Sequence, residues 1–341
     1  MTRNYLITGG AGFIGSNYVH RLIQRGETVT IYDNLSRAGA PRNLTWLEEA
    51  FGKDAFKLIL GDLRNAELLT ESAKGADVIV HLAGQVAVTT SVTNPRDDFE
   101  ANALGTFNAL EAARLSDRNP IFIYASTNKV YGGMDEIELV EEATRWRYKD
   151  LLNGCSEIQP LDFHSPYGCS KGTGDQYVRD YARIYGLRSV VFRQSCIYGP
   201  RQFGIEDQGW LAWMMIAAVT GKQITIYGDG KQVRDVLHVN DLLNAYDAAI
   251  EKIDHTQGEV YNMGGGTGNV LAVWAEFGPI LEKLLGRKLE VARADWRPGD
   301  QRVFYADFSK ARRELGWEPK IDLEEGMEML FEWVKANKDL F

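Results

Sequence analysis

The sequence predicts an α/β protein: a doubly wound parallel sheet, followed by a smaller mixed α/β domain. Three observations predict this class. Short apolar runs alternate with amphipathic stretches over about the first 190 residues, as in repeated strand–helix units. A glycine-rich turn joins the first apolar run to the first amphipathic stretch. Beyond residue 193 the alternation ends, so we expect a second domain there.

The first domain is expected to contain six strands, each a short run of β-branched and other apolar residues. We expect them at residues 5–8, 29–32, 56–60, 77–82, 121–124 and 189–193. The stretch from Phe99 to Leu115 and the stretch that carries Tyr167 and Lys171 have helical periodicity. In a doubly wound sheet the ligand-binding loops follow the carboxyl ends of the strands.

The second half is richer in aromatic residues. We expect helices near residues 209–220, 241–250, 271–285 and 323–334, and strands at 223–227, 233–237 and 289–292. This pattern predicts a first domain at residues 1–192 and a second at 193–341. Part of 233–263 is expected to return to the first sheet.

The glycine-rich turn contains Gly9, Gly12 and Gly15 between the first strand and the first helix. Such glycines allow a tight turn, close approach of a pyrophosphate and packing of the helix on the strand. The free N–H groups at the helix N-terminus favour that anion. Asp33 ends the second strand, 24 residues after Gly9, where an acid can bond a ribose hydroxyl and repel a 2′-phosphate. The segment therefore predicts a Rossmann-type domain that prefers NAD to NADP.

Tyr167 and Lys171 stand four residues apart, and on a helix they share one face. An ammonium near a phenol favours the phenolate and lowers its pKa. A phenolate in that position could take the proton of an alcohol while a nicotinamide takes its hydride. The pair is therefore a candidate catalytic pair.

Composition excludes several partners. The formal net charge is −9 and the pI about 5.2, which argues against nucleic acid or an anionic membrane. No apolar run approaches the roughly 20 residues of a membrane span, and the first strand begins so early that we expect no signal peptide. Cys155, Cys169 and Cys196 are odd in number and lack metal-ligand spacing, so we expect a reducing, cytoplasmic location and no metal.

A set of motifs in this order resembles the extended short-chain dehydrogenases/reductases that act on nucleotide sugars. The resemblance spans almost the whole chain. It is carried by Gly9, Gly12 and Gly15, Asp33, Asp62, Leu82-Ala83-Gly84, Asn102, Ser126-Thr127, Val130-Tyr131-Gly132, Tyr167 and Lys171, Tyr198-Gly199-Pro200, Arg234-Asp235 and Arg297-Pro298-Gly299-Asp300.

Within that superfamily, residues 82–91, 126–132 and 161–171 most resemble the CDP-tyvelose (CDP-paratose) 2-epimerases. Residues 201–203 and 207–210 extend the match. This resemblance implies a CDP-sugar substrate and NAD as a recycled cofactor. It implies oxidation of the sugar to a keto-sugar at C2, followed by return of the hydride to the opposite face. The assignment to C2 rests on the resemblance alone.

Two departures bear on neighbouring activities. Nucleotide-sugar 4,6-dehydratases carry Asp-Glu after the catalytic threonine, where this chain has Asn128-Lys129, so dehydration is not expected. UDP-sugar 4-epimerases carry an asparagine where Cys196 stands, which argues against UDP-type recognition. Two alternatives stay open: a C4-epimerase of a UDP- or CDP-sugar, and a non-catalytic NAD-binding interaction protein.

The resemblance assigns roles to individual residues. The catalytic residues are Tyr167 as the base, Lys171, which would also bond the nicotinamide ribose, and Thr127, which would bond the reacting oxygen. The cofactor-binding residues are Gly9, Gly12, Phe13, Ile14, Gly15, Asp33, Asn34, Ser36, Arg37, Asp62, Leu63, Leu82, Ala83, Gly84, Gln85, Asn102, Ser126, Tyr167, Lys171 and Gln194. The substrate-binding residues are Thr127, Asn128, His164, Cys196, Arg201, Gln202, Thr225, Tyr227, Arg234, Arg297 and Asp300. A homo-oligomer, dimer or tetramer, is also expected from the family.

Overall fold

The computed structural model describes residues 2–297 and 300–341. Pro298 and Gly299, from the motif that ends in Asp300, lie outside the described residues. The chain forms two compact units. Unit 1 comprises Met1–Val130, Ser165–Arg193 and Leu243–Tyr261; unit 2 comprises Tyr131–His164, Gln194–Leu242 and Asn262–Phe341. Residues 131–164 belong to unit 2, although the sequence-based division assigns them to the first domain.

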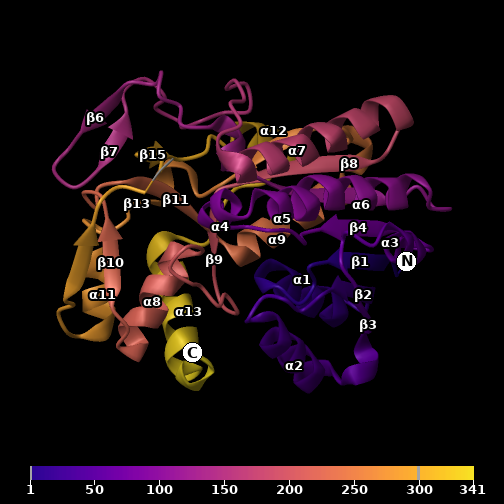
Figure 1. Cartoon of the computed structure of the whole chain (residues 1–341), viewed down its shortest axis with the longest axis horizontal. Helices are drawn as coiled ribbons and strands as arrows, with labels where there is room; N and C mark the ends of the chain where they lie inside the picture. The colour runs from indigo at the N-terminus through magenta and orange to yellow at the C-terminus, as the bar shows by residue number, and fades with distance from the viewer. Residues whose placement is uncertain (1, 298–299) are drawn as a thin grey trace. The chain divides into compact units, whose positions relative to one another are not determined.

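A seven-stranded sheet forms the centre of unit 1, with the strand order β12-β8-β5-β4-β1-β2-β3. Figure 1 labels its strands β1, β2, β3, β4 and β8. β1 pairs in parallel with β2 and β4, β2 with β3, and β4 with β5. The prediction of a doubly wound parallel sheet is confirmed. The strands are β1 (Asn4–Thr8), β2 (Thr28–Asp33), β3 (Lys57–Leu60), β4 (Val78–His81), β5 (Ile121–Thr127), β8 (Ser189–Gln194) and β12 (Val260–Met263), the last two reaching unit 2 with their final residues.

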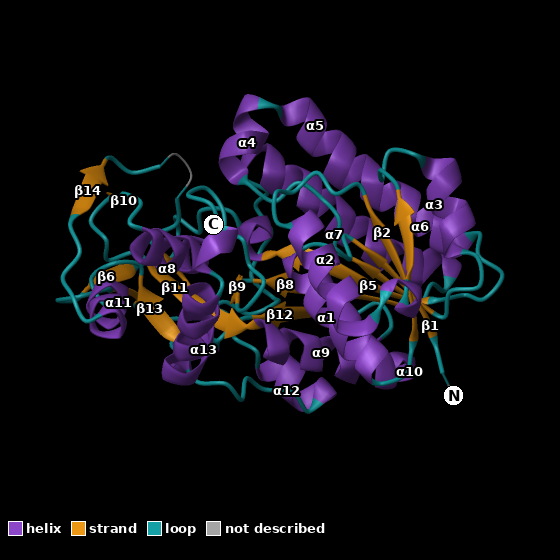
Figure 2. Cartoon of the chain, turned by 90° about the horizontal axis from the view of Figure 1, so that it is seen from below, coloured by secondary structure: helices purple, strands orange, loops and turns teal. Residues whose placement is uncertain are grey.

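Helices cover both faces of this sheet (Figure 2). Tyr18 of α1 packs edge-on against Tyr246 of α9, on the face that α1 and α2 share. Helices α3, α6 and α7 pack on the other face, where Leu110, Phe122 and Val178 belong to one buried cluster. The helices are α1 (Phe13–Gln24), α2 (Ala40–Phe51), α3 (Ala66–Ala73), α4 (Val88–Thr93), α5 (Pro95–Phe99), α6 (Gly105–Arg114), α7 (Ser165–Tyr185), α9 (Val239–Glu251) and α10 (Ile253–Thr256).

The helix expected from Phe99 to Leu115 contains a π-helical turn. This turn, Glu100–Leu104, lies between α5 and α6 and carries Asn102. π-turns inside helices are rare and occur frequently at functional sites. The turn therefore makes this segment a candidate part of a functional site.

Unit 2 is built from smaller sheets and the helices packed against them. β11 pairs with β13, β15 and β9, and β10 pairs in parallel with β14. Apolar residues of α8, α11 and α13 form its core. The elements are β6 (Leu139–Glu141), β7 (Trp146–Tyr148), β9 (Cys196–Tyr198), α8 (Trp210–Thr220), β10 (Ile224–Tyr227), β11 (Val233–His238), β13 (Val270–Ala272), α11 (Phe277–Leu285), β14 (Val291–Ala294), β15 (Val303–Phe304), α12 (Ser309–Leu315) and α13 (Leu323–Ala336).

One expected helix is shorter than its sequence pattern indicates. The segment 271–285 was expected to be helical throughout, but α11 begins at Phe277. Val270–Ala272 form β13 instead, because they pair with β11, where Ala272 lies opposite Val233. Among the described residues, every helix is too short or too polar to cross a lipid bilayer.

Candidate active site

The candidate cofactor residues follow strand ends that the register of the sheet holds side by side. Thr8 at the end of β1 lies opposite both Tyr32 and His81, and His81 lies opposite Tyr124. Gly9, Asp33, Leu82 and Ala125 follow these four positions in the sequence. Because all four strands run in the same direction, the segments that follow them meet at one edge of the sheet.

The glycine turn is closed by its own backbone. Gly9 N–H donates to Tyr32 O at 2.8 Å, and Gly12 N–H donates to Gly9 O at 3.0 Å. Gly9 has φ 71°, and a Cβ on Gly15 would lie 2.2 Å from Gly9 O, so neither position tolerates a side chain. α1 begins at Phe13, and its first turn carries no acidic residue. The N-terminus of α1 therefore suits an anionic group such as a pyrophosphate.

Two aspartates stand after β2 and β3. Asp33 is buried and accepts hydrogen bonds from Ala11 N–H at 3.0 Å and Leu35 N–H at 2.8 Å. Burial raises the pKa of its carboxyl, and these two bonds act against that effect. Each carboxylate oxygen has a further lone pair, so Asp33 can still accept a ribose hydroxyl.

Asp62 belongs to a polar cluster that includes Asn34. Asn34 Nδ2 donates to Asp62 Oδ2 at 3.1 Å, and the Arg64 guanidinium donates to both carboxylate oxygens at 2.7 and 2.8 Å. Arg64 holds the pKa of Asp62 well below its usual range. Arg64 also pairs with Asp97 of α5 at 3.1 Å. The sequence analysis missed Arg64, although its position two residues after Asp62 was a usable signal.

The remaining candidate cofactor residues are distributed over unit 1, with one exception. Gln85 N–H donates to Asn102 Oδ1 at 2.9 Å, which ties the loop after β4 to the π-turn. Leu63 is buried, and Ser36 and Arg37 are exposed before α2. Phe13, Ile14 and Gly15 form the first turn of α1; Leu82, Ala83 and Gly84 follow β4; Ser126 lies in β5; Gln194, the exception, ends β8 in unit 2.

Tyr167 and Lys171 lie on the buried face of α7, as predicted from their spacing. A hydrogen bond to α4 holds this end of the helix: Tyr167 N–H donates to the side-chain Oγ of Ser91 at 3.1 Å. Ser165, which begins α7, has φ 67°, an uncommon left-handed conformation for serine. Tyr167 therefore follows a strained helix start.

Burial opposes the expected lowering of the Tyr167 pKa by Lys171. Burial raises the pKa of Tyr167 to about 12, and only the neighbouring Thr127 hydroxyl lowers it. Lys171 Nζ donates to Ala125 O at 2.5 Å and lies over the Tyr124 ring. Burial also lowers the pKa of Lys171 to about 8. In this arrangement the desolvation of the phenol outweighs the ammonium four residues away.

Thr127 and Ser126 differ in their partners. Ser126 Oγ donates to Asp175 Oδ2 at 2.8 Å, and Asp175 is bound by Arg193 at 2.8 and 2.9 Å. The Thr127 hydroxyl donates to Asn128 Oδ1 at 3.4 Å, and it lowers the pKa of Tyr167. These contacts favour Thr127 over Ser126 as the hydroxyl that could bond a reacting oxygen.

In unit 2 the candidate substrate residues gather in two clusters. Around Tyr227, the Arg297 guanidinium covers the ring at 3.9 Å, and the phenol donates to Glu206 Oε1 at 3.0 Å. Arg297 also pairs with Asp207 at 3.1 Å. Thr225 lies two residues before Tyr227 on the same, partly exposed face of β10. Glu206 was not identified from the sequence.

The second cluster pairs Arg234 with Asp300. Arg234 is buried, and its guanidinium donates to Asp300 Oδ1 at 2.6 Å and to Val233 O at 2.7 Å. The other candidates of unit 2 contact different residues or are exposed. Cys196 Sγ accepts from Trp210 Nε1 at 3.4 Å, Gln202 Nε2 donates to Ile197 O at 3.2 Å, Arg201 lies over the Trp333 ring, and His164 is exposed.

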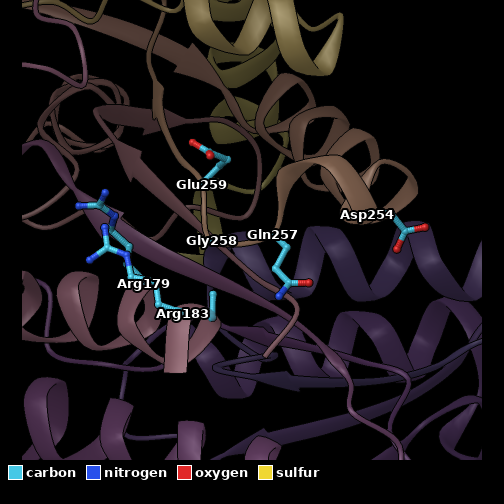
Figure 3. Close-up of a pocket in the computed structure, with 7 residues that line it drawn as sticks. Arg179, Arg183, Asp254, Gln257, Gly258 and Glu259 are labelled. Atoms are coloured by element: carbon cyan, nitrogen blue, oxygen red, sulfur yellow. The ribbon is translucent and has the colours of Figure 1, made fainter. Parts of the chain in front are cut away.

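A surface hollow in unit 1 is lined by residues that are not among the candidate site residues. Arg179 and Arg183 of α7 extend side by side into it, and Glu259 and Gln257 line it from the segment before β12 (Figure 3). Asp254, also at its rim, pairs with Arg188 at 3.2 Å. Its lining shares no residue with the candidate site, so the hollow does not contribute to it.

Three known proteins are similar to this chain over nearly its full length. The CDP-paratose 2-epimerase of Salmonella typhi is 44% identical over 338 residues, which cover 97% of this chain and 99% of that protein. The crystal structure of UDP-glucose 4-epimerase from Thermotoga maritima with UDP-glucose has a TM-score of 0.82 at 31% identity, covering 98% of this chain and 99% of that one. The dTDP-glucose 4,6-dehydratase of Streptomyces venezuelae, crystallised with NAD bound, has a TM-score of 0.84 at 28% identity and covers 99% and 98%.

A family model described as GDP-mannose 4,6 dehydratase matches residues 6–330. This range includes the glycine turn, α7 and both clusters of unit 2. The match and the similarity to full-length relatives agree with the motifs of the sequence. The chain therefore belongs to the GDP-mannose 4,6 dehydratase family of extended short-chain dehydrogenases/reductases.

Proposed function

We propose that this protein is an NAD-dependent isomerase that epimerises a CDP-hexose at C2, as in the interconversion of CDP-paratose and CDP-tyvelose. The observation that carries the proposal is the buried group Thr127, Tyr167 and Lys171 on β5 and α7. It accompanies a glycine turn at the same sheet edge. The 44% identity to a CDP-paratose 2-epimerase supports the substrate class.

The residues present fit NAD. The N-terminus of α1 would hold the pyrophosphate, Asp33 a ribose hydroxyl, and the segments after β3 and β4 the rest of the cofactor. Asp33 favours NAD over NADP because a carboxylate repels a 2′-phosphate. When bound, NAD supplies a hydride acceptor, which later returns the hydride.

Tyr167 moves the proton. Its phenolate takes the proton of the sugar hydroxyl and later returns one to the ketone oxygen, on either face of the sugar. Thr127 bonds the reacting oxygen and stabilises the phenolate, since its hydroxyl already lowers the pKa of Tyr167. Lys171 contributes its charge and bonds the nicotinamide ribose.

Unit 2 binds the nucleotide part of the substrate in this proposal. An arginine fork suits the oxygens of a diphosphate, which assigns that role to Arg234 and Arg297. Tyr227 offers a flat ring for a nucleobase, and Asp300 can accept a ribose hydroxyl. We assign Thr225, Arg201, Gln202, Cys196 and His164 to the same substrate role in unit 2, and we assign Asn128 of unit 1 to the sugar.

Asn128 and Lys129 support epimerisation over dehydration. Elimination of water requires an acid and a base positioned at neighbouring carbons. An amide and a lysine at these positions do not provide that pair of carboxyl groups. A C4-epimerase remains the second candidate, because the UDP-glucose 4-epimerase of Thermotoga maritima shares the fold at 31% identity.

The test is a product analysis with four substrates: CDP-paratose, CDP-tyvelose, CDP-glucose and UDP-glucose. We expect inversion at C2 of a CDP-sugar, measured by proton NMR, with deuterium placed at C2 retained in the product because the hydride never exchanges with water. Inversion at C4, or activity on the UDP-sugar alone, would contradict the proposal. Absence of turnover on all four would favour a non-catalytic NAD-binding protein.

We also propose that the protein is a homo-oligomer, a dimer or a tetramer. The π-turn before α6, together with α6 and α7, exposes several large apolar side chains: Leu104, Phe107, Leu115, Tyr177, Ile184 and Tyr185. Such a surface is unusual for a monomer. Light scattering of the purified protein, compared with a Phe107→Glu variant, tests this assignment. We also propose a cytoplasmic location, because three cysteines, at 155, 169 and 196, suit a reducing compartment.

A further inference from the structure

Asp98 is a buried carboxylate that the sequence analysis did not identify. It lies in α5 and is 1% exposed. Its Oδ1 accepts hydrogen bonds from Gln85 Nε2 at 3.0 Å and from Asn102 Nδ2 at 3.2 Å. Its Oδ2 is also buried and has no hydrogen-bond partner at normal distance within the described part of the chain, although the Ser170 hydroxyl is near enough to lower the pKa of the carboxyl. A buried carboxylate oxygen without a partner is costly and calls for a functional explanation.

The contacts of Asp98 reach the catalytic helix. Asn102 Nδ2 also bonds Ser170 Oγ at 3.1 Å, and Ser170 Oγ donates to Tyr167 O at 3.2 Å. Gln85 and Asn102 are both candidate cofactor residues and are themselves joined at 2.9 Å. One carboxylate therefore connects the loop after β4, the π-turn and α7.

Asp98 is also close enough to act on the charges of the catalytic pair. Its negative charge raises the pKa of Tyr167 and that of Lys171. Burial raises the pKa of Asp98, and the Ser170 side chain and then the charge of Lys171 act against that effect. The charged and titratable groups around this pair are Asp97 and Asp98 of α5, Tyr167, Lys171 and Asp175 of α7, His81 of β4, Tyr124 of β5 and Arg193 of β8.

The two carboxylates that act on Lys171 differ in their partners. Asp175 has the larger effect on the pKa of Lys171 and is itself paired with Arg193 at 2.8 Å, whereas Asp98 has the second effect. Among the residues that the structure describes, no arginine or lysine lies within ion-pair distance of Asp98. The negative charge of Asp98 is therefore available to the neighbouring ammonium.

We propose that Asp98 is a positioning residue that keeps Lys171 charged and holds Gln85 and Asn102 in place for the cofactor. The inference rests on the proposed function for the role of Lys171. Asp98 acts through Lys171 and Tyr167 and has no direct contact with the reacting atoms in this assignment.

The test is Asp98→Asn, which keeps an acceptor oxygen for Gln85 and Asn102 but removes the charge. NAD affinity is measured by calorimetry from pH 6 to 9.5, without any sugar. In the wild type, affinity should fall as pH rises through about 8, where Lys171 loses its proton. In Asp98→Asn that fall should begin about half to one pH unit lower, because the charge that raised the pKa of Lys171 is gone.

Turnover provides a second profile. The basic limb of kcat against pH, set by Lys171, should move to lower pH in Asp98→Asn, with the KM of the sugar nucleotide little changed. Asp97→Asn is the matched control, since Asp97 lies on the same helix but pairs with the exposed Arg64 at 3.1 Å. Asp98→Glu, which keeps the charge, should lower the rate and leave the basic limb where it is.

The outcomes separate this inference from the proposed function. A shifted affinity profile without turnover on any CDP-sugar would sustain the role of Asp98 and reject the substrate. Superimposable profiles for Asp98→Asn and the wild type, even with a lower rate, would overturn the inference. If Asp98→Asn does not fold, Asp98→Glu decides the matter. A basic limb of kcat at a different pH would overturn the inference, and an unmoved basic limb with a lower kcat would support it.

Discussion

The Lys171 ammonium lies 4.4 Å from the centre of the Tyr124 ring and donates to the Ala125 carbonyl at 2.5 Å. Both partners belong to β5, so the lysine is held against the strand that ends at Thr127. The aromatic face and the carbonyl oxygen stabilise the cation, whereas burial destabilises it and lowers its pKa to about 8. Lys171 is therefore charged at neutral pH and loses that charge as the pH rises through 8.

Lys171→Met should lower kcat by two orders of magnitude or more, because the charge beside the tyrosine and a contact to the cofactor are lost together. The decline of activity near pH 8 should disappear from the residual rate. Initial rates from pH 6 to 9.5 provide the measurement, with Lys74→Met, an exposed lysine, as control. A residual rate that still declines near pH 8 would assign that limb to another group.

Tyr167→Phe removes one hydroxyl and should leave the helix and its packing unchanged. We expect NAD and substrate binding close to the wild type, and kcat lower by about three orders of magnitude, since only proton transfer is lost. Binding by calorimetry and rates by NMR give the two numbers. Tyr177→Phe, a half-exposed tyrosine of the same helix, should be neutral. Turnover within tenfold of the wild type would reject Tyr167 as the base.

Thr127→Val preserves shape and removes the hydroxyl that lowers the pKa of Tyr167. We expect kcat to fall about 10²- to 10³-fold, because the phenolate becomes harder to form without this hydroxyl. Ser126→Ala should instead reduce stability, since Asp175 loses a partner at 2.8 Å, with a smaller effect on kcat. If Ser126→Ala lowered kcat more than Thr127→Val, Ser126 and not Thr127 would be the residue that bonds the reacting oxygen.

Arg234→Ala should act on substrate binding. A lost contact of an arginine to phosphate costs about 2 kcal/mol, so KM should rise roughly 30-fold while kcat changes less. Stability should fall only slightly, because Asp300 keeps access to solvent when its partner is removed. Arg293→Ala, on the exposed surface of β14, is the matched control. An unchanged KM would remove Arg234 from the diphosphate site.

Local sequence predicts much of the fold and of the catalytic pair. The strands of the first sheet are apolar runs between turns, and the shared face of Tyr167 and Lys171 follows from helical geometry alone. The stretch 270–272 is different. It continues a helical pattern, yet it forms a strand because β11 lies alongside it. Pairing with a distant segment overrode local periodicity there.

Side-chain direction could not be read from spacing. Lys171 donates to the carbonyl of Ala125, 46 residues earlier, and the pKa of Tyr167 is raised chiefly by burial, which also depends on tertiary packing. Asp98 shows a partial signal. It stands one helical turn before Asn102, so the shared face was visible, but its burial and its open oxygen depend on how α5 packs.

His81 gives the fold of unit 1 a pH dependence. Its ring nitrogens contact Thr8 Oγ1 at 2.8 Å and Thr106 Oγ1 at 3.2 Å, and burial lowers its pKa to about 3. Since the folded pKa lies below the unfolded one, the stabilising contribution is complete above about pH 6.5. It is lost as the pH falls, by up to about 1.4 kcal/mol per pH unit.

His81→Gln should therefore be less stable than the wild type at pH 7, and this difference in the free energy of unfolding should narrow toward pH 4. Urea unfolding at several pH values measures this gap, and the exposed His255→Gln should show none. A constant gap between pH 7 and 4 would mean that His81 does not titrate differently in the folded and unfolded chains.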